Sequence, residues 1–243
     1  MRYKLLNTEV DSLDKKDTID KIIYSIEHRK RIYQVSINAD KVNLIEDSPK
    51  LKEIISQADL INADGISIVW AAKILKVPIK HRVTGVDLFY ELLEISDKKR
   101  YSIYFLGATQ ESLENMISII KQKYPLIEVA GYHNGYFEDN QPIIDEIQLV
   151  KPDILFLGFS SPQKEFWIEK YKDIVRVAFI MGVGGSFDVY SGKTKRAPKF
   201  MQEAGLEWLY RFIQEPRRMF RRYIFGNIEF TKKVIKEKFK WIF

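Results

Sequence analysis

The 243-residue sequence contains no cysteine. This absence excludes disulfides, thiolate metal ligands and cysteine nucleophiles, and it fits a reducing compartment. Long apolar runs are also missing. Uncharged stretches such as residues 177–187 fall well short of the roughly 18 apolar residues that a spanning helix needs, and the charged N-terminus does not read as a secretion signal. We therefore expect a cytoplasmic chain that does not cross a membrane.

Motifs for metal ions and for nucleophilic hydrolysis are scarce as well. The three histidines, at positions 28, 81 and 133, do not have the spacing of a zinc or iron site, and no D-x-D motif for a metal-bound diphosphate occurs. A G-x-S-x-G nucleophile elbow is also absent. We expect chemistry that uses no metal ion and no other cofactor.

Positive charge is concentrated at the C-terminal end of the chain. From Lys195 onward, 13 Lys and Arg stand against 5 Asp and Glu, a net charge of +8, whereas residues 1–194 sum to −2. We expect an α/β core over residues 1–194 and a basic, aromatic-rich helical appendage over residues 195–243, broken near Pro216. The appendage allows three interpretations: an anchor on an anionic membrane surface, a lid over the core, or a merely solvated basic face.

Short apolar runs alternate with segments of helical period. Six runs read as strands, at residues 32–37, 58–63, 101–106, 127–132, 153–159 and 177–183. After the third of these, Gly107 turns the chain, Thr109 can cap a helix, and apolar residues at positions 113, 116, 117 and 120 form one helix face. This alternation predicts a Rossmann-like, doubly wound α/β fold with a mainly parallel sheet of about six strands.

Polar residues and glycines follow these strands, where open parallel sheets bind their ligands. Asp64 follows an apolar strand and precedes Gly65, so its carboxylate is placed either to deprotonate a hydroxyl or to cap the next helix. The pattern by itself leaves both alternatives open. The other strand-end candidates are Ser36, Asn38, Asp40, Gly107, Thr109, Ser160, Ser161, Gln163, Gly182, Gly184, Gly185 and Asp188.

Three further groups are candidates for binding anions. Arg82 precedes a Thr84–Gly85 turn into a helix, which suits a diphosphate clamp but also a solvated basic turn. The glycines of residues 181–192 follow a strand as phosphate loops do, yet they match no known phosphate motif, and a tight turn explains them equally well. Arg211, Arg218 and Arg221 would share one face if their helix were continuous.

The ordered motifs resemble those of the WecG/TagA/CpsF glycosyltransferases over most of the chain. They are SIN with Asp40, NADGISIVWAAK, RVTGVDLFYEL, FLGATQES, LGFSSPQKEFWI and MGVGGSFDVYSGKTKRAPKFMQEAGLEWLYRFIQEPRR. As an ordered set they are very specific. One departure concerns residues 162–165, which read Pro-Gln-Lys-Glu where the family usually has Pro-Lys-Gln-Glu, so that Lys164 takes the usual glutamine position. A second is Ser36, which stands where threonine is common.

The resemblance implies an inverting, metal-independent transfer in which Asp64 is the base. It also implies that Ser36 and Asn38 are polar positions of the active site, that Arg82 lies near the donor diphosphate, and that the appendage arginines complete the site. Electrostatic stabilisation by arginine would then replace a metal ion. The remaining candidate donor- and acceptor-binding positions are Asn62, Thr84, Gly107, Thr109, Gln163, Lys164, Gly184, Gly185 and Asp188.

The leading hypothesis, which the resemblance implies, is transfer of N-acetylmannosamine from a UDP donor to the GlcNAc of a polyprenyl-diphosphate acceptor, in teichoic acid linkage-unit synthesis at the inner face of the cell membrane. An alternative keeps the family but uses N-acetylmannosaminuronate or glucose. A nucleic-acid-binding protein would explain the basic tail but not the polar strand ends, so we expect no nucleic-acid partner. Apolar surface on an undocked tail would also support a homo-oligomer.

Overall fold

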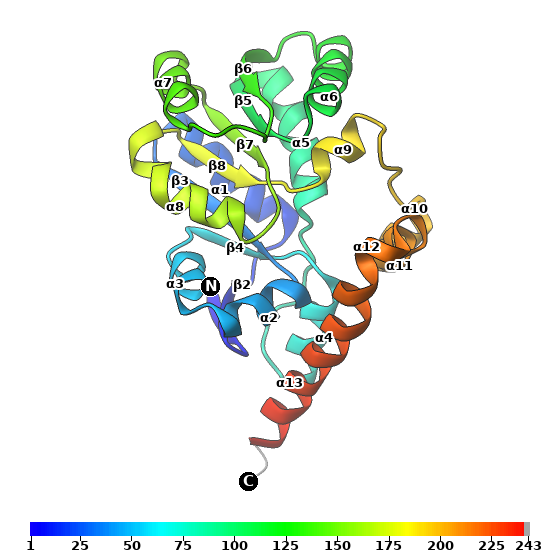
Figure 1. Ribbon diagram of the computed structural model, residues 1–243. Helices are drawn as coiled ribbons and strands as arrows, with labels where there is room; N and C mark the ends of the chain where they lie inside the picture. Colours follow the sequence, from blue (N-terminus) through cyan, green and yellow to red (C-terminus); the bar gives the residue numbers. More distant parts are fainter. Residues whose placement is uncertain (241–243) are drawn as a thin grey trace.

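The computed structural model describes residues 1–240, without the side chains of Arg218, Arg221 and Arg222. A six-stranded sheet runs through the centre of the molecule, and every pair of neighbouring strands in it is parallel (Figure 1). The predicted α/β, Rossmann-like fold is confirmed. In spatial order the strands are β4 (Leu60–Ala63), β3 (Ile32–Ile37), β8 (Phe179–Gly182), β7 (Ile154–Gly158), β5 (Ser102–Gly107) and β6 (Glu128–His133).

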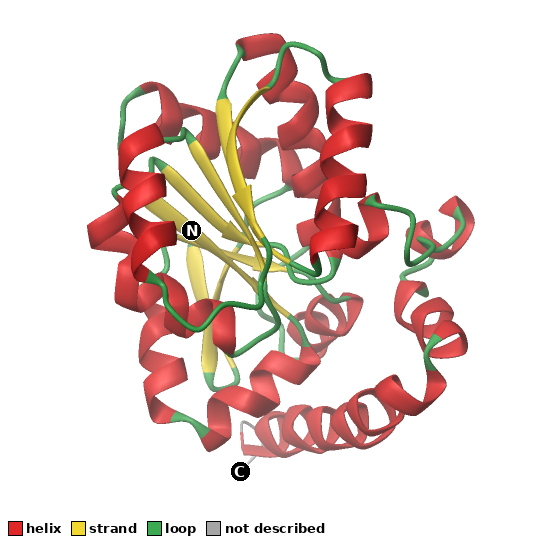
Figure 2. Cartoon of the chain, turned by 45° about the horizontal axis from the view of Figure 1, so that its top comes forward, coloured by secondary structure: helices red, strands yellow, loops and turns green. Residues whose placement is uncertain are grey.

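Helices cover both faces of this sheet (Figure 2). The apolar cluster on one face includes α1 (Lys15–Glu27), α5 (Gly85–Lys99), α6 (Gln110–Lys123) and α9 (Ser186–Tyr190). The cluster on the other face includes α2 (Ala39–Asp47), α3 (Pro49–Ser56), α4 (Ile66–Ile74), α7 (Gln141–Val150) and α8 (Gln163–Val175).

Strand β5 shows why the central strands read as continuous apolar runs. Ile103 and Phe105 pack into one cluster, whereas Tyr104 and Leu106 pack into the other, and all four are fully buried. A parallel strand covered on both faces needs apolar residues at every position. The predicted cap and face of the following helix are confirmed as well, because the Thr109 hydroxyl accepts from the Ser112 amide and the apolar residues at 113, 116, 117 and 120 are buried.

An N-terminal hairpin was not expected from the sequence. Strands β1 (Arg2–Leu5) and β2 (Thr8–Asp11) pair antiparallel in a separate two-stranded sheet. Arg2 pairs with Asp11 at 3.0 Å and donates to the Ala58 carbonyl at 2.8 Å, which attaches the hairpin to the segment before β4. The bond to Ala58 joins residues 56 positions apart, so local pattern gave no signal for it.

The C-terminal tail consists of short helices and a final helix of 15 residues. It runs along one side of the core and brings its last helix beside α2 and α4 (Figure 1). The predicted break at Pro216 is confirmed, because α11 ends at Gln214 and α12 begins at Pro216. Among the described helices, none is both long enough and apolar enough to span a membrane. The tail helices are α10 (Lys199–Glu203), α11 (Glu207–Gln214), α12 (Pro216–Phe220), the π-helix η1 (Arg221–Phe225) and α13 (Gly226–Lys240).

Helix α13 is the part of the tail that is fastened most firmly to the core. Phe230 and Val234 are buried in the apolar cluster that contains α2. The Asn43 side chain of α2 donates to the Gly226 carbonyl at 2.9 Å and accepts from Lys233 Nζ at 3.0 Å. Lys233 also forms ion pairs with Glu46 and Glu229. The tail is therefore anchored at its far end.

Candidate active site

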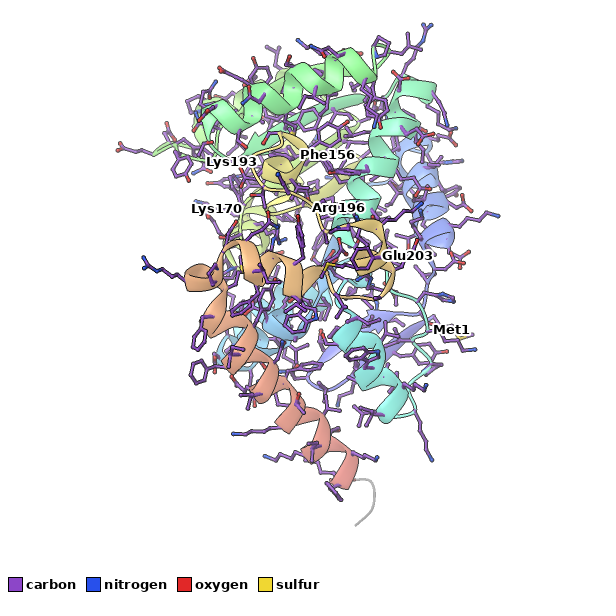
Figure 3. The ribbon with its side chains drawn as sticks, turned by 90° about the vertical axis from the view of Figure 1, so that its right-hand side faces the viewer. Met1, Phe156, Lys170, Lys193, Arg196 and Glu203 are labelled. Carbon is purple, nitrogen blue, oxygen red and sulfur yellow. The ribbon has the colours of Figure 1, made fainter. Side chains whose placement is uncertain are left out.

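A cavity of about 520 Å³ lies between the carboxyl ends of β3 and β4 and the tail. Its volume is in the range that small-ligand sites usually occupy. The core contributes Asn38, Asp64 and Thr84 to the lining, and the tail contributes about half of the wall, including Trp208 and Arg211. Figure 3 shows Arg196 and Glu203 on the segment where the tail leaves the core. The cavity therefore requires both parts of the chain.

Asp64 is held at the floor of this cavity. Its Oδ1 accepts a hydrogen bond of 2.9 Å from the amide of Gly85, the first residue of α5. Its Oδ2 has no hydrogen-bond partner among the described residues. The helix that follows Asp64, α4, begins at Ile66 and has Gly65 as its N-cap residue without a side-chain cap, so Asp64 does not cap it. One carboxylate oxygen is thus fixed by a helix N-terminus, where negative charge is favoured, and the other is available to a ligand.

Three other predicted polar positions lie around and beneath Asp64. Asn38 lines the cavity and caps α2 by accepting from the Lys41 amide at 3.0 Å. Ser36 and Asn62 are buried within the sheet, where Gln34 Nε2 donates to both side chains. A Cβ built at Gly85 would lie 3.4 Å from the Ser36 hydroxyl, which places that hydroxyl below the turn that holds Asp64. Ser36 and Asn62 therefore form the support of the site rather than its lining.

Arg82 is bound by the tail in this structure. Its Nη2 donates to the Gln202 carbonyl at 3.0 Å and to Glu207 Oε2 at 3.1 Å. The side chain lines the cavity and is largely shielded from solvent. It is therefore not the solvated basic turn that the sequence left open. A diphosphate that binds Arg82 directly would have to share it with Glu207.

Glu207 also binds a second arginine. Its Oε1 accepts from Arg196 Nε at 3.2 Å, and the same guanidinium pairs with Asp87 on α5. Burial alone would raise the pKa of Asp87, but hydrogen bonds from Thr84 and Arg196 outweigh burial and lower it. Thr84, another predicted position, caps α5 and donates to Asp87 at 2.7 Å. This network joins the tail to the start of α5, which also holds Asp64.

Arg211 reaches from the tail to the glycine turn after β8. A Cβ built at Gly185 would lie 3.2 Å from Arg211 Nη2. Lys164 crosses the same strand end: its Nζ donates to the Gly182 carbonyl at 3.1 Å, and a Cβ built at Gly184 would lie 3.9 Å from it. Gly184 has a φ of +54°, which favours glycine. Two cations therefore flank the Gly184–Gly185 turn.

Four further predicted positions lie outside the cavity lining, as do Ser36, Asn62, Lys164, Gly184 and Gly185. Gly107 has a φ of +134°, and a Cβ there would lie 2.7 Å from the Gly158 backbone, so it permits close approach of β5 and β7. Thr109 caps α6. Asp188 accepts from Ser112 at 2.7 Å, and Gln163 is exposed on the first turn of α8. The structure gives the first three of these residues structural contacts.

The three tail arginines do not lie on one continuous helix, because α11 ends before Pro216. Arg211 lines the cavity. The side chains of Arg218 and Arg221 lie outside the part of the chain that the structure describes.

A buried ion pair beside the site was not recognised in the sequence. Lys41 Nζ lies 2.6 Å from Glu165 Oε1, and both side chains are at most 3% exposed. The Ser161 hydroxyl donates to the same oxygen at 3.0 Å. Burial alone would raise the pKa of Glu165, but the charges of Lys41 and Lys164 outweigh burial and lower it. The pair connects the Asn38-capped turn of α2 to α8, and the only sequence signal was Glu165 within the Pro-Gln-Lys-Glu motif.

The fold and the cavity define a Rossmann-like protein with a carboxylate and several cations at the carboxyl ends of its strands. The model of the glycosyl transferase WecG/TagA/CpsF family matches residues 3–242. The chain therefore belongs to this family and is a glycosyltransferase. Nothing in the fold or the family favours the nucleic-acid-binding alternative.

Curated relatives share one printed name, N-acetylglucosaminyldiphosphoundecaprenol N-acetyl-beta-D-mannosaminyltransferase. The relative from Bacillus spizizenii is 36% identical over 79% of this chain and 75% of its own length. A relative from Staphylococcus aureus is 34% identical over 82% of this chain and 78% of its own length.

Proposed function

We propose that this chain transfers N-acetylmannosamine from UDP-N-acetylmannosamine to the GlcNAc of undecaprenyl-diphosphate-GlcNAc, a step of teichoic acid linkage-unit synthesis. The observation that carries the proposal is the position of Asp64, whose Oδ2 faces a cavity that also contains arginines from the core and the tail. The shared name of the relatives supports the choice of donor sugar and acceptor.

The proposed reaction is a single inverting displacement. Asp64 Oδ2 takes the proton of the acceptor hydroxyl while the hydroxyl oxygen bonds to the anomeric carbon of the donor sugar. The bond from that carbon to the UDP oxygen breaks, and UDP leaves with the electron pair. The hydrogen bond from the Gly85 amide holds the carboxylate in place during this transfer.

The leaving diphosphate needs positive charge, because its bond breaks with a gain of negative charge. Arg211 and Lys164 flank the Gly184–Gly185 turn and are placed to supply it. Arg82 contributes if the diphosphate takes over part of its bond to Glu207. We infer that these cations serve in place of a metal ion, and that activity persists in excess EDTA.

We further propose that the tail, residues 195–243, is both a lid on the site and an anchor on the inner face of the cell membrane. Its support is the cavity wall that the tail provides, together with exposed apolar side chains in this basic segment. Phe220, Phe225 and Phe239 are among these exposed side chains. A homo-oligomer that covers this surface stays a prediction.

A donor panel tests the proposed function. The full-length protein is incubated with a soluble GlcNAc-diphosphate-lipid acceptor and one donor at a time, and released UDP is measured. UDP-N-acetylmannosamine should release UDP in an acceptor-dependent way. Faster release from UDP-N-acetylmannosaminuronate or UDP-glucose would move the chain to another donor, and no release from any of the three would contradict the proposal.

A further inference from the structure

The cavity that contains Asp64 has two chemically different ends. Asp64, Arg82 and Arg211 make one end polar and charged. The other end lies between α4 and α13, and none of the described lining residues from these two helices is charged. Its apolar lining residues are Ile66, Trp70, Ala71, Ile74, Phe230 and Val234.

Helix α4 exposes large apolar side chains toward this end. Trp70 is 56% exposed and Ile74 is 47% exposed, although both line the cavity. Four residues separate them, so they lie on the same face of the helix. The same helix buries Ile68, Ala71 and Ala72 in the core and does not need these two side chains for packing. An uncovered Trp and Ile beside a catalytic cavity indicate an apolar ligand.

Helix α13 provides the opposite wall at a fixed position. Its contacts with Asn43 and Glu46 hold it on α2, and it runs beside α4 (Figure 1). Phe230 and Val234 face the cavity, whereas Ile228, Ile235 and Phe239 are about half exposed on the outside of the helix. Helix α13 therefore lines the apolar end of the cavity with one face and exposes an apolar stripe to solvent with the other.

We propose that the apolar face between α4 and α13 binds the first isoprene units of the polyprenyl acceptor. This subsite rests on the function proposed above and adds the part of the acceptor that reaches beyond its diphosphate. Ser67, Asn227 and Thr231 also line this part of the cavity and offer hydrogen bonds. A nucleotide-sugar donor nevertheless does not suit this end, because its diphosphate needs positive charge and none of the described lining residues of α4 and α13 is charged. The acceptor carries an apolar chain at the end away from its reacting sugar, and the cavity lining likewise becomes mainly apolar from Asp64 along α4 to Ile74.

The position of the tail also favours entry of the polyprenyl chain between α4 and α13. A Cβ built at Gly205 would lie 2.9 Å from Ile66 Cγ1, so the tail closes over the first turn of α4. Trp208 and Tyr223 of the tail also line the cavity, with ring centroids 5.8 Å apart. Trp70 and Ile74 lie one and two turns further along α4, away from this contact. The apolar chain thus passes from Asp64 along α4 toward the outer stripe of α13.

Two acceptors that differ only in their lipid test the subsite. GlcNAc-diphosphate is supplied as its methyl ester and as its farnesyl ester, both monomeric in solution and without vesicles. In the wild type, the farnesyl acceptor should have the higher kcat/KM. In Trp70→Ala the farnesyl-to-methyl ratio of kcat/KM should fall at least about tenfold, because apolar area buried on the lipid is lost. Ile74→Gln should lower the ratio in the same direction.

Leu149→Ala is the matched control, since Leu149 is 81% exposed on α7, far from the cavity lining. It should leave both kcat/KM values unchanged. An unchanged ratio in both the Trp70 and the Ile74 variants overturns the subsite. Two other results would assign this face to another occupant. If the Trp70 and Ile74 variants lose only vesicle binding, the face binds the bilayer surface. If the wild type is a dimer and the variants lose that dimer with an unchanged farnesyl-to-methyl ratio, the face binds a second copy of the chain.

Calorimetry separates failure of the subsite from failure of the proposed function. The farnesyl acceptor should bind the wild type at least about tenfold more tightly than it binds Trp70→Ala, whether or not sugar is transferred. If the wild type releases no UDP from any donor but this difference is present, the proposed transfer fails and the lipid subsite stands. If UDP is released and the two proteins bind the farnesyl acceptor equally, the subsite fails and the transfer stands.

Discussion

The core and the tail differ in how they cover their apolar side chains. Each core strand from β3 to β8 except the edge strand β6 is almost entirely buried, because helices pack on both faces of the sheet. Helices α10 and α11 have no buried residue, and Phe200 and Ile213 are each about two-thirds exposed. The core is therefore stabilised by its own packing, whereas this part of the tail leaves apolar side chains exposed.

The two parts also use ion pairs differently. The Lys41–Glu165 pair is enclosed within the core, where an unpaired charge costs several kcal/mol. The pairs of Glu207 with Arg82 and Arg196 lie where the tail meets the core, next to the cavity, and are partly exposed. We infer that the first pair fixes the fold and that the second set fixes the position of the tail. The following variants compare the core with the tail, and two of them test the buried pair.

The largest effect is expected for Asp64→Asn. Loss of the base should lower kcat about a thousandfold, which is within the range that general-base catalysis supplies. The midpoint of thermal unfolding and the affinity for UDP should stay near their wild-type values, because the asparagine oxygen can still accept from the Gly85 amide. UDP-release assays measure kcat, scanning calorimetry measures the midpoint of thermal unfolding, and titration calorimetry measures the affinity for UDP. Undiminished turnover would show that another residue is the base.

Lys41→Met should have the largest effect on stability. It leaves Glu165 buried without its partner, so the free energy of unfolding should fall by about 3 to 5 kcal/mol. Chemical denaturation at neutral pH measures the change. Lys50 is exposed on α3, so Lys50→Met is the matched control and should change the free energy of unfolding by less than about 0.5 kcal/mol. Equal effects of the two variants would contradict the structural importance of the buried pair.

Arg211→Met tests the tail as part of the site. Removing one charge beside the Gly184–Gly185 turn should lower kcat about a hundredfold, with little change in stability because α11 buries no side chain. Arg217→Met removes the same charge from an exposed position in the tail and should retain full activity on a soluble acceptor. If both variants lose activity equally, the effect belongs to the tail's net charge rather than to Arg211.

Acid should weaken the core through Glu165. Its pKa is lowered in the folded state, so the folded protein binds fewer protons than the unfolded chain near the ordinary value of 4.5. The stabilisation is complete above that value and is lost as the pH falls through the lower folded pKa. Denaturation curves between neutral pH and pH values below 4.5 should show the loss, and Glu165→Gln should flatten the slope. An equally steep slope in this variant would assign the acid sensitivity to other carboxylates.

The smallest effect concerns membrane binding by the far end of the tail. Lys232 and Lys236 are exposed on α13, and each lysine near an anionic surface contributes about 1 kcal/mol. The double variant Lys232→Gln/Lys236→Gln should bind anionic liposomes about thirtyfold more weakly in sedimentation assays. The matched change of Lys50 and Lys52 to glutamine on α3 should leave binding unchanged. If the α3 variant loses liposome binding and the α13 variant keeps it, the membrane-binding surface lies on the core.

Much of the fold followed from local pattern. The six strands were placed to within two residues of their observed starts and ends, and the cap at Thr109 and the break at Pro216 were both predicted. The β1–β2 hairpin was missed although its strands pair locally, with Leu5 opposite Thr8. Only its attachment to the segment before β4 joins residues far apart in the chain. Asp64 was predicted as a candidate from its strand end, but its bond to Gly85 was not.

By itself, the sequence determined the alternation of strands and helices, the family, the basic tail and the candidate carboxylate, because periodicity, motifs and composition are local or ordered along the chain. Only the tertiary structure decided which residues meet. It turned Arg82 toward Glu207, placed Arg211 beside Gly185, and brought α13 next to α4. These contacts join residues from distant parts of the chain, and no local propensity specifies such a distance.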